Sequence, residues 1–133
     1  MAIILPIVRH LIPCEDYFIH AAHPEKISLI NLIFGIRSLQ DPPFPVVQRE
    51  FCLFLMLSNG RGKGNLRLAI VQVDTDEAIL KTAVRPINFG NDPLRVIGLP
   101  IRIKDCEFPA AGLYSIEVTF DDQLIGQQQL LLK

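Results

Sequence analysis

The chain has 133 residues, of which half are hydrophobic, with 13 basic and 14 acidic side chains. A net charge of −1 lacks the basic excess of a nucleic-acid-binding surface, so we expect no nucleic-acid partner. This length fits a single domain, residues 1–133, which can bury only about two-thirds of the surface that its unfolded chain exposes. We therefore expect the apolar excess to reach the surface or to be covered by another chain.

The N-terminal segment and the cysteines indicate where the protein works. Residues 1–7 are apolar but few, and Arg9 follows them, whereas a signal peptide begins with its positive charge. No apolar run reaches the ~20 residues of a membrane span. Cys14, Cys52 and Cys106 are odd in number and lack Cys-x-x-Cys spacing. We therefore expect free thiols in the cytoplasm and no membrane association.

Apolar segments recur about every dozen residues between Gly, Pro, Asn and Asp, and helical periodicity is almost absent, which is typical of an all-β sandwich or barrel. We expect about eight strands. The first covers residues 2–12, with Pro6 at an edge, and residues 13–25 are expected to be polar and irregular. The later strands are expected at residues 27–36, 51–57, 66–73, 78–84, 94–103, 112–120 and 124–132. Gly98 and Pro100 mark the strand 94–103 as an edge or bulged strand.

The segment from Phe51 to Leu57 is apolar on both faces, which predicts a central strand covered on two sides. In a sandwich of two sheets, the outer cover must come from a loop or from another subunit. This predicts a homo-oligomer or a protein partner. The positions expected at the interface are Phe54, Met56, Leu130 and Leu132, together with the strand 94–103 and its free edge.

The last 26 residues predict a strand, a tight turn at Asp121-Asp122-Gln123 and a second strand. Gly112-x-Tyr114 at the start of the first of these strands resembles the penultimate strand of immunoglobulin-like sandwiches, in which the Tyr hydroxyl fixes the preceding corner. We expect a single-domain antiparallel β-sandwich with an immunoglobulin-like Greek key. A jelly roll also fits eight short strands.

One cluster of polar side chains includes all three histidines and one cysteine within 14 positions: His10, Cys14, His20 and His23. Such ligands can bind zinc, but their spacing matches no zinc template. Pro24 also prevents the helix on which His20 and His23 would share a face. We expect no metal and no cofactor, and keep a small-ligand or metal site on this segment as the alternative.

The segment Gly60-Arg61-Gly62-Lys63-Gly64 is rich in glycine, as phosphate-binding loops are. A P-loop, however, continues with Ser or Thr and opens a helix, whereas Gly64 and Asn65 follow here and a strand comes next. Phosphate or nucleic-acid binding through Arg61 and Lys63 is therefore not expected. No serine has a Gly-x-Ser-x-Gly setting, and we expect no enzyme activity.

Several features in a fixed order carry a resemblance to a known family. They are Cys14 to Tyr17, the run from Lys26 to Ile36, Pro45 to Leu57, Gly64 with Leu66-Arg67-Leu68, and Phe108-Pro109, Gly112-x-Tyr114, Asp121-Asp122 and Ile125-Gly126. In this order they resemble a bacterial family of short immunoglobulin-like β-sandwich proteins, domain-of-unknown-function family 6941. The resemblance implies the fold and supplies no activity, ligand or catalytic residue. The expectation is a non-enzymatic protein that self-associates or binds a protein partner.

Overall fold

The computed structural model describes residues 4–133, and the regular structure of this part consists of ten strands without a helix. The strands are β1 (Ile7–Ile19), β2 (Ile27–Leu32), β3 (Gly35–Ile36), β4 (Val46–Ser58), β5 (Lys63–Gln72), β6 (Glu77–Lys81), β7 (Arg85–Asn88), β8 (Ile97–Phe108), β9 (Gly112–Phe120) and β10 (Gln123–Leu132). The expected all-β fold is confirmed, with ten strands in place of about eight.

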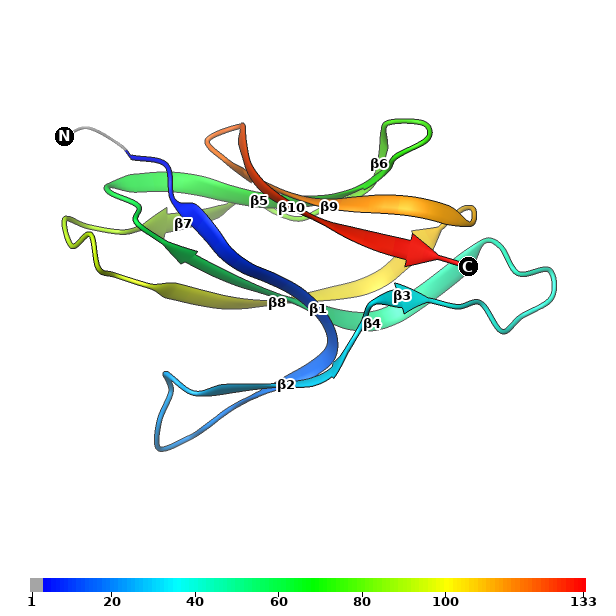
Figure 1. Cartoon of the computed structure of the whole chain (residues 1–133), viewed down its shortest axis with the longest axis horizontal. Coiled ribbons are helices and arrows are strands. Elements are labelled where there is room, and N and C mark those ends of the chain that lie inside the picture. Colours follow the sequence, from blue (N-terminus) through cyan, green and yellow to red (C-terminus); the bar gives the residue numbers. More distant parts are fainter. Residues whose placement is uncertain (1–3) are drawn as a thin grey trace.

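The strands form two sheets that lie one above the other (Figure 1). The first sheet has the order β2-β1-β4-β8, and the second has the order β3-β10-β9-β5-β6, with β7 also paired to β5. The short strand β3 runs parallel to β10, and every other pair is antiparallel.

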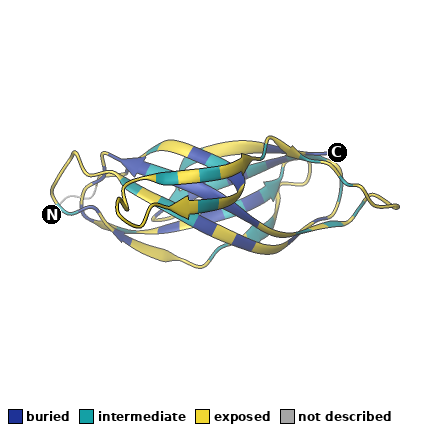
Figure 2. Cartoon of the chain, turned by 90° about the horizontal axis from the view of Figure 1, so that it is seen from below, coloured by how far each residue is buried: buried dark blue, intermediate teal, exposed yellow. Residues whose placement is uncertain are grey.

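The core lies between the sheets, and alternation along the strands supplies it. In β9 every second side chain, from Tyr114 to Phe120, is fully buried. Bands of buried and exposed residues alternate along the strands in Figure 2. The expected final hairpin is confirmed as β9 and β10, and its turn residues Asp121 and Asp122 have φ values of 48° and 64°, which Asp tolerates better than most residues.

Tyr114 fixes the corner before β9, as the sequence predicts. Its hydroxyl donates to the Ala110 carbonyl at 2.8 Å and accepts from the Ala110 N–H at 3.3 Å. The ring packs edge-on against Phe108, with centroids 5.1 Å apart. The same residue therefore fills the core and holds the connection from β8 in place.

Strand β4 is buried on both faces, as expected. Phe51, Leu53 and Leu55 belong to the core between the sheets, while Cys52 and Phe54 on the other face are 0% and 7% exposed. The outer cover comes from the chain itself, because β1 continues past residue 12 to Ile19 and forms a hairpin with β2. The cover that the sequence analysis assigned to a loop or a second subunit is therefore an intramolecular hairpin.

The prediction that residues 13–25 are irregular is wrong for residues 13–19, which belong to β1. The geometry at Pro13 explains why. The Pro13 carbonyl accepts a hydrogen bond from the Ile33 N–H at 2.8 Å, so the backbone groups of Pro13 face away from its partner Leu53 on β4. The missing N–H therefore costs no bond between β1 and β4, and the strand passes through the proline.

The β1–β2 hairpin lies across the outer face of the first sheet. A Cβ atom placed on Gly98 of β8 would lie 3.5 Å from Phe54 Cζ and 3.9 Å from Ile27 Cδ1, so β2 reaches β8 over the ring of Phe54. The hairpin lies below the first sheet in Figure 1. In Figure 2, which is seen from below, it passes in front of the other strands of that sheet.

One expected strand is divided in the structure, and another is shortened. The strand expected at 27–36 becomes β2 and β3, separated by two residues, and that at 78–84 shortens to β6 and is followed by β7. Gly35 begins β3 because a Cβ there would lie 2.9 Å from the Leu131 carbonyl oxygen. A glycine thus allows β3 to approach β10 closely enough to pair.

A candidate strand-binding groove beside β8

Strand β8 is the last strand of the first sheet and pairs with β4 alone among the strands of residues 4–133. The expected edge position of this segment is confirmed. One side of β8 is therefore a row of backbone N–H and C=O groups without a neighbouring strand, and such an edge is a template for pairing with another chain.

The register identifies the backbone groups on this free edge. The backbone groups of Pro13 on β1 face away from its partner Leu53 on β4. The backbone groups of Leu53 therefore point to the other side, toward β8, and bond to Ile101, the residue paired with Leu53 there. Alternate residues point the other way. Those on the free edge are Gly98, Pro100, Arg102 and Lys104. Pro100, which has no N–H, is placed where proline is tolerated in a sheet.

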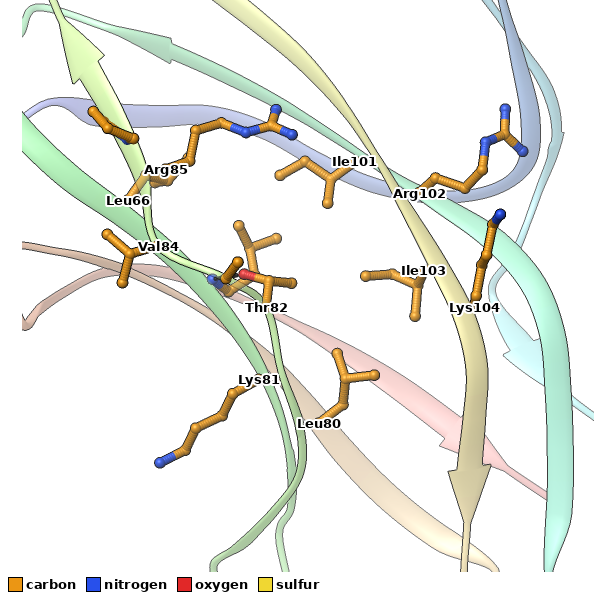
Figure 3. Close-up of a pocket in the computed structure, with 13 residues that line it drawn as sticks. Leu66, Leu80, Lys81, Thr82, Val84, Arg85, Ile101, Arg102, Ile103 and Lys104 are labelled. Carbon is orange, nitrogen blue, oxygen red and sulfur yellow. Dashed lines mark hydrogen bonds between the residues drawn. The ribbon is translucent and has the colours of Figure 1, made fainter.

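A groove of about 400 Å³ runs along this edge (Figure 3). It is lined by Leu66 and Leu68 of β5, residues 80–86 from the end of β6 to the start of β7, and residues 101–104 of β8. Leu80, Ile101 and Ile103 point into it. This volume lies in the usual range for binding pockets, roughly 300–1,000 Å³. We call this feature the β8 groove.

The far wall of the β8 groove is held by β5. The Thr82 N–H donates to the Leu68 carbonyl at 2.9 Å, and the Leu68 N–H donates to the Thr82 hydroxyl at 3.0 Å. These two bonds fix the segment between β6 and β7 to the second sheet, so it is not paired with β8. The groove is thus a preformed gap between the two sheets.

The lining of the β8 groove contains four cationic residues and no carboxylate: Lys81, Arg85, Arg102 and Lys104. Arg102 is paired on the outer face of the sheet, 3.0 Å from Asp16 and 2.8 Å from Glu50, and these two bonds raise its pKa. Its guanidinium also lies 5.2 Å from the centre of the Tyr17 ring. Arg102 therefore attaches the hairpin to β8, and the other three cations form no ion pair within residues 4–133.

The pKa of Asp16 is lowered, first by the hydrogen bond that its carboxylate accepts from the Tyr17 N–H and then by Arg102. Both contacts favour the charged carboxylate. The pair of Asp16 and Arg102 therefore stays ionised at neutral pH, and Arg102 is not available as an unpaired cation.

The four positions expected at an interface lie mostly inside the chain. Phe54 is 7% exposed beneath the hairpin, Leu130 and Leu132 are each 1% exposed in the core, and Met56 is half-buried. They lie there because the hairpin covers β4 and because β10 belongs to the second sheet. As placed in the single chain, these side chains offer little surface to a partner.

Several strongly exposed apolar side chains lie on and after the β1–β2 hairpin. Phe18 is 58% exposed, Leu32 is 50% exposed, and Phe34, in the short link to β3, is 88% exposed. The apolar excess was expected on β4, on the strand 94–103 and near the end of β10. Of these positions, Leu94 and Val96, just before β8, are 85% and 56% exposed. The outward-facing side chains of the hairpin escaped notice because part of this hairpin was expected to be irregular.

The candidate metal ligands do not come together. His10 lies exposed on β1 opposite Met56, and Cys14 is fully buried opposite Cys52. Only His20 and His23 meet, with ring centroids 5.1 Å apart at the tip of the hairpin. Among residues 4–133, no three His, Cys, Asp or Glu side chains are placed to hold a metal ion.

The buried thiols favour their protonated form. Burial is the main cause of the raised pKa of Cys14 and of Cys52, and burial alone raises the pKa of Cys106 to about 11. A thiolate is the reactive form of cysteine, so this environment opposes a nucleophilic role for Cys14.

The glycine-rich segment serves packing. A Cβ atom on Gly60 would lie 2.6 Å from the Phe89 ring, and one on Gly64 would overlap the Phe120 ring. Lys63 already belongs to β5, so no helix follows to complete a phosphate-binding loop. The glycines let two aromatic rings pack against the backbone.

The cations of the β8 groove were missed from the sequence. Lys81, Arg85 and Lys104 lie on three different strands, and only the fold brings them to one groove. The one local signal was Arg102-Ile103-Lys104, a cationic alternation two residues after Pro100. Alternation of charge with Ile indicates a strand with one polar face, and the proline indicates an edge.

The fold and this site define a class: an all-β, two-sheet protein with a preformed groove beside an unpaired edge strand. The chain belongs to a family of unknown function, DUF6941, whose model matches residues 20–133. The resemblance stated from the sequence is thereby confirmed. No curated protein matches the chain. Within residues 4–133, no helix is long and apolar enough to cross a membrane.

Proposed function

We propose that this protein is a non-enzymatic binding module that accepts an extended segment of another protein as an additional strand beside β8. The observation that carries the proposal is the free edge of β8, which borders a preformed groove. Strand addition combines backbone hydrogen bonds, which give affinity, with pockets for alternate side chains, which give specificity. The β8 groove offers both.

We further infer that the sandwich is immunoglobulin-like. On this view β1, β4 and β8 correspond to strands A, B and E, and β5, β9 and β10 to strands C, F and G. The corner at Tyr114 supports this assignment, because a conserved tyrosine occupies the start of strand F in that fold. In immunoglobulin domains a strand D pairs with strand E. Here that place beside β8 is the groove.

A reducing cytoplasm remains the proposed location. Cys14, Cys52 and Cys106 are all free and buried, which suits a compartment that keeps thiols reduced.

Amide hydrogen exchange with NMR detection tests the proposed mode of binding. In the free protein, we expect the N–H groups of Arg102 and Lys104 to exchange quickly and those of Ile101 and Ile103 slowly, because only the latter bond to β4. Strand-length peptides selected from a random library should protect the first pair. Peptides that bind without protecting these amides, or a library without binders, would contradict the proposal.

A second candidate function is self-association through the outward side of the β1–β2 hairpin. The exposed Phe18, Leu32 and Phe34 favour it, since apolar surface exposed on one element of a small protein is typical of an interaction site. Light scattering behind size exclusion, over a concentration series, should then show a dimer that Phe18→Ser with Leu32→Ser dissociates. A monomer at every concentration would exclude this candidate.

A further inference from the structure

We infer that the segment bound in the β8 groove is acidic: an extended stretch of a different protein in which Asp or Glu alternates with apolar residues. This inference rests on the proposed function and assigns a chemical class to the ligand. It follows from the two faces that an added strand would present, from the charges around the groove and from the composition of β8 itself.

An added strand would turn alternate side chains into the groove and outward. The inward side chains would meet Leu80, Ile101 and Ile103, together with the buried leucines of β5. Val84, on the far wall, is 46% exposed in the free protein and would lose water on binding. The inward positions of the ligand are therefore apolar.

Cations surround the place of the added strand. Lys104 is an exposed side chain on β8 itself, and Arg85, at the start of β7, extends from the far wall toward β8 (Figure 3). Lys81, at the end of β6, extends away from β8 and contributes its charge from a greater distance. The groove lining holds no carboxylate to balance them, while Arg102 is already neutralised by Asp16 and Glu50. Complementary charge determines which partner binds and how fast it associates, so the remaining ligand positions are acidic.

A second copy of this chain is a poor occupant of the same edge. The edge positions of β8 carry no carboxylate, so antiparallel pairing with β8 of another molecule would bring to this edge a second Lys104, which forms no ion pair within residues 4–133. Like charges across a strand pair repel each other. Charged side chains and proline on an edge strand also prevent pairing between identical sheets. The edge of β8 carries Pro100 together with Arg102 and Lys104.

The free edge sets the length of the ligand. From Gly98 to Lys104 it spans seven residues, or roughly 20 Å at ~3.3 Å per residue. Carbonyl groups are available at all four edge positions, but the N–H donors are three, since Pro100 supplies none. A ligand strand of about seven residues with three or four inward apolar side chains matches this edge.

Three capped synthetic peptides of nine residues test the inference: Val alternating with Glu, with Ser and with Lys. Titration calorimetry at low and at physiological ionic strength should show the Glu peptide binding about tenfold tighter than the Ser peptide, with the advantage shrinking as salt rises. The Lys peptide should bind weakest. Hydrogen exchange at Arg102 and Lys104 would locate each bound peptide.

Charge reversal supplies the matched control. The double variant Arg85→Glu with Lys104→Glu should invert the order of the Glu and Lys peptides. Lys26→Glu with Lys63→Glu changes the net charge equally, at exposed positions outside the groove, and should leave the order unchanged. If both variants shift the order equally, the preference reflects net charge, and the inference fails.

The outcomes separate the inference from the proposed function. If the three peptides protect the β8 edge equally, or the Lys peptide binds tightest there, the acidic ligand is wrong while strand addition stands. If no peptide, acidic or otherwise, alters the edge amides, both fail. If these amides are protected without peptide in a dimer, the ligand is a second copy and the inference fails. If a variant does not fold, the salt dependence of peptide binding to the unaltered protein still tests whether the groove prefers an acidic ligand.

Discussion

The two lateral sides of this sandwich differ. On one side, β1 of the first sheet lies against β10 of the second, so closely that a Cβ atom on Gly126 would be 2.7 Å from Val8 Cγ2. There β3 extends the second sheet further. On the other side, β8 faces the segment 80–86 across an open groove.

The difference shows what allows the two sheets to meet along one side of the sandwich. The closed side has a glycine at the point of contact and buried leucines behind it, such as Leu130 and Leu132. The open side also has buried residues, Ile101 and Ile103, but a rim of long cationic side chains. A sandwich can thus bury its core completely and still leave one sheet ready to accept a strand.

The largest expected effect lies on the closed side and compares two adjacent leucines. Leu132 is 1% exposed in the core, whereas Leu131 is 38% exposed. We expect Leu132→Ala to lower the free energy of unfolding by about 2–5 kcal/mol through lost burial and the cavity left behind. Leu131→Ala should cost less than about 1 kcal/mol. Urea unfolding of both variants provides the measurement, and equal costs would place Leu132 outside the core.

The next prediction concerns the pH dependence of stability that arises from Cys106, a buried residue of β8. It tests whether β8 is part of the core despite its open edge. The pKa of Cys106 is about 11 in the folded chain and about 9.0 when unperturbed. Between these two values the unfolded chain loses the proton first, so stability should fall as pH rises from 9 to 11, by at most about 2.7 kcal/mol. Below pH 9 this contribution is fully retained.

The control for this pH effect is Cys106→Ala, which keeps every other titrating group. The difference in unfolding free energy between the two proteins, measured by denaturant titration at several pH values, should change only above pH 9. A difference that stays constant to pH 11 would mean that solvent reaches the thiol.

The third prediction compares two glycines, one on each side of the sandwich. Gly126→Ala must separate β1 from β10 and should cost about 1–3 kcal/mol. At Gly98 on β8, the added methyl group would meet Phe54 at 3.5 Å, an ordinary contact, so Gly98→Ala should change stability by less than about 0.5 kcal/mol. A larger loss at Gly98 than at Gly126 would reverse the assignment of open and closed sides.

The sequence predicts the structure correctly where one strand's own pattern decides it. The β9–β10 hairpin follows from alternating apolar residues and two aspartates in the turn, and the corner at Tyr114 follows from the residues next to it. The burial of β4 on both faces could also be predicted, because a strand whose apolar residues do not alternate with polar ones has no polar face.

The cover of β4 could not be read in the same way. Pro13 and the polar residues that follow it suggest a loop, and only the direction of the Pro13 carbonyl, toward Ile33, allows β1 to continue. That direction depends on the pairing with β2. The β8 groove could not be predicted either, because it depends on cations from three separate strands and on a free edge, beside which residues 4–133 place no strand.

The tip of the β1–β2 hairpin has a practical consequence. Residues 20–26 are all exposed, and their backbone bonds, such as His20 N–H to Lys26 carbonyl at 3.1 Å, stay within the turn. Exposed tips of this kind accept inserted sequence. An affinity tag or a fluorescent label between Ala21 and Ala22 would therefore allow this protein to be immobilised or followed by microscopy with both chain ends left unaltered.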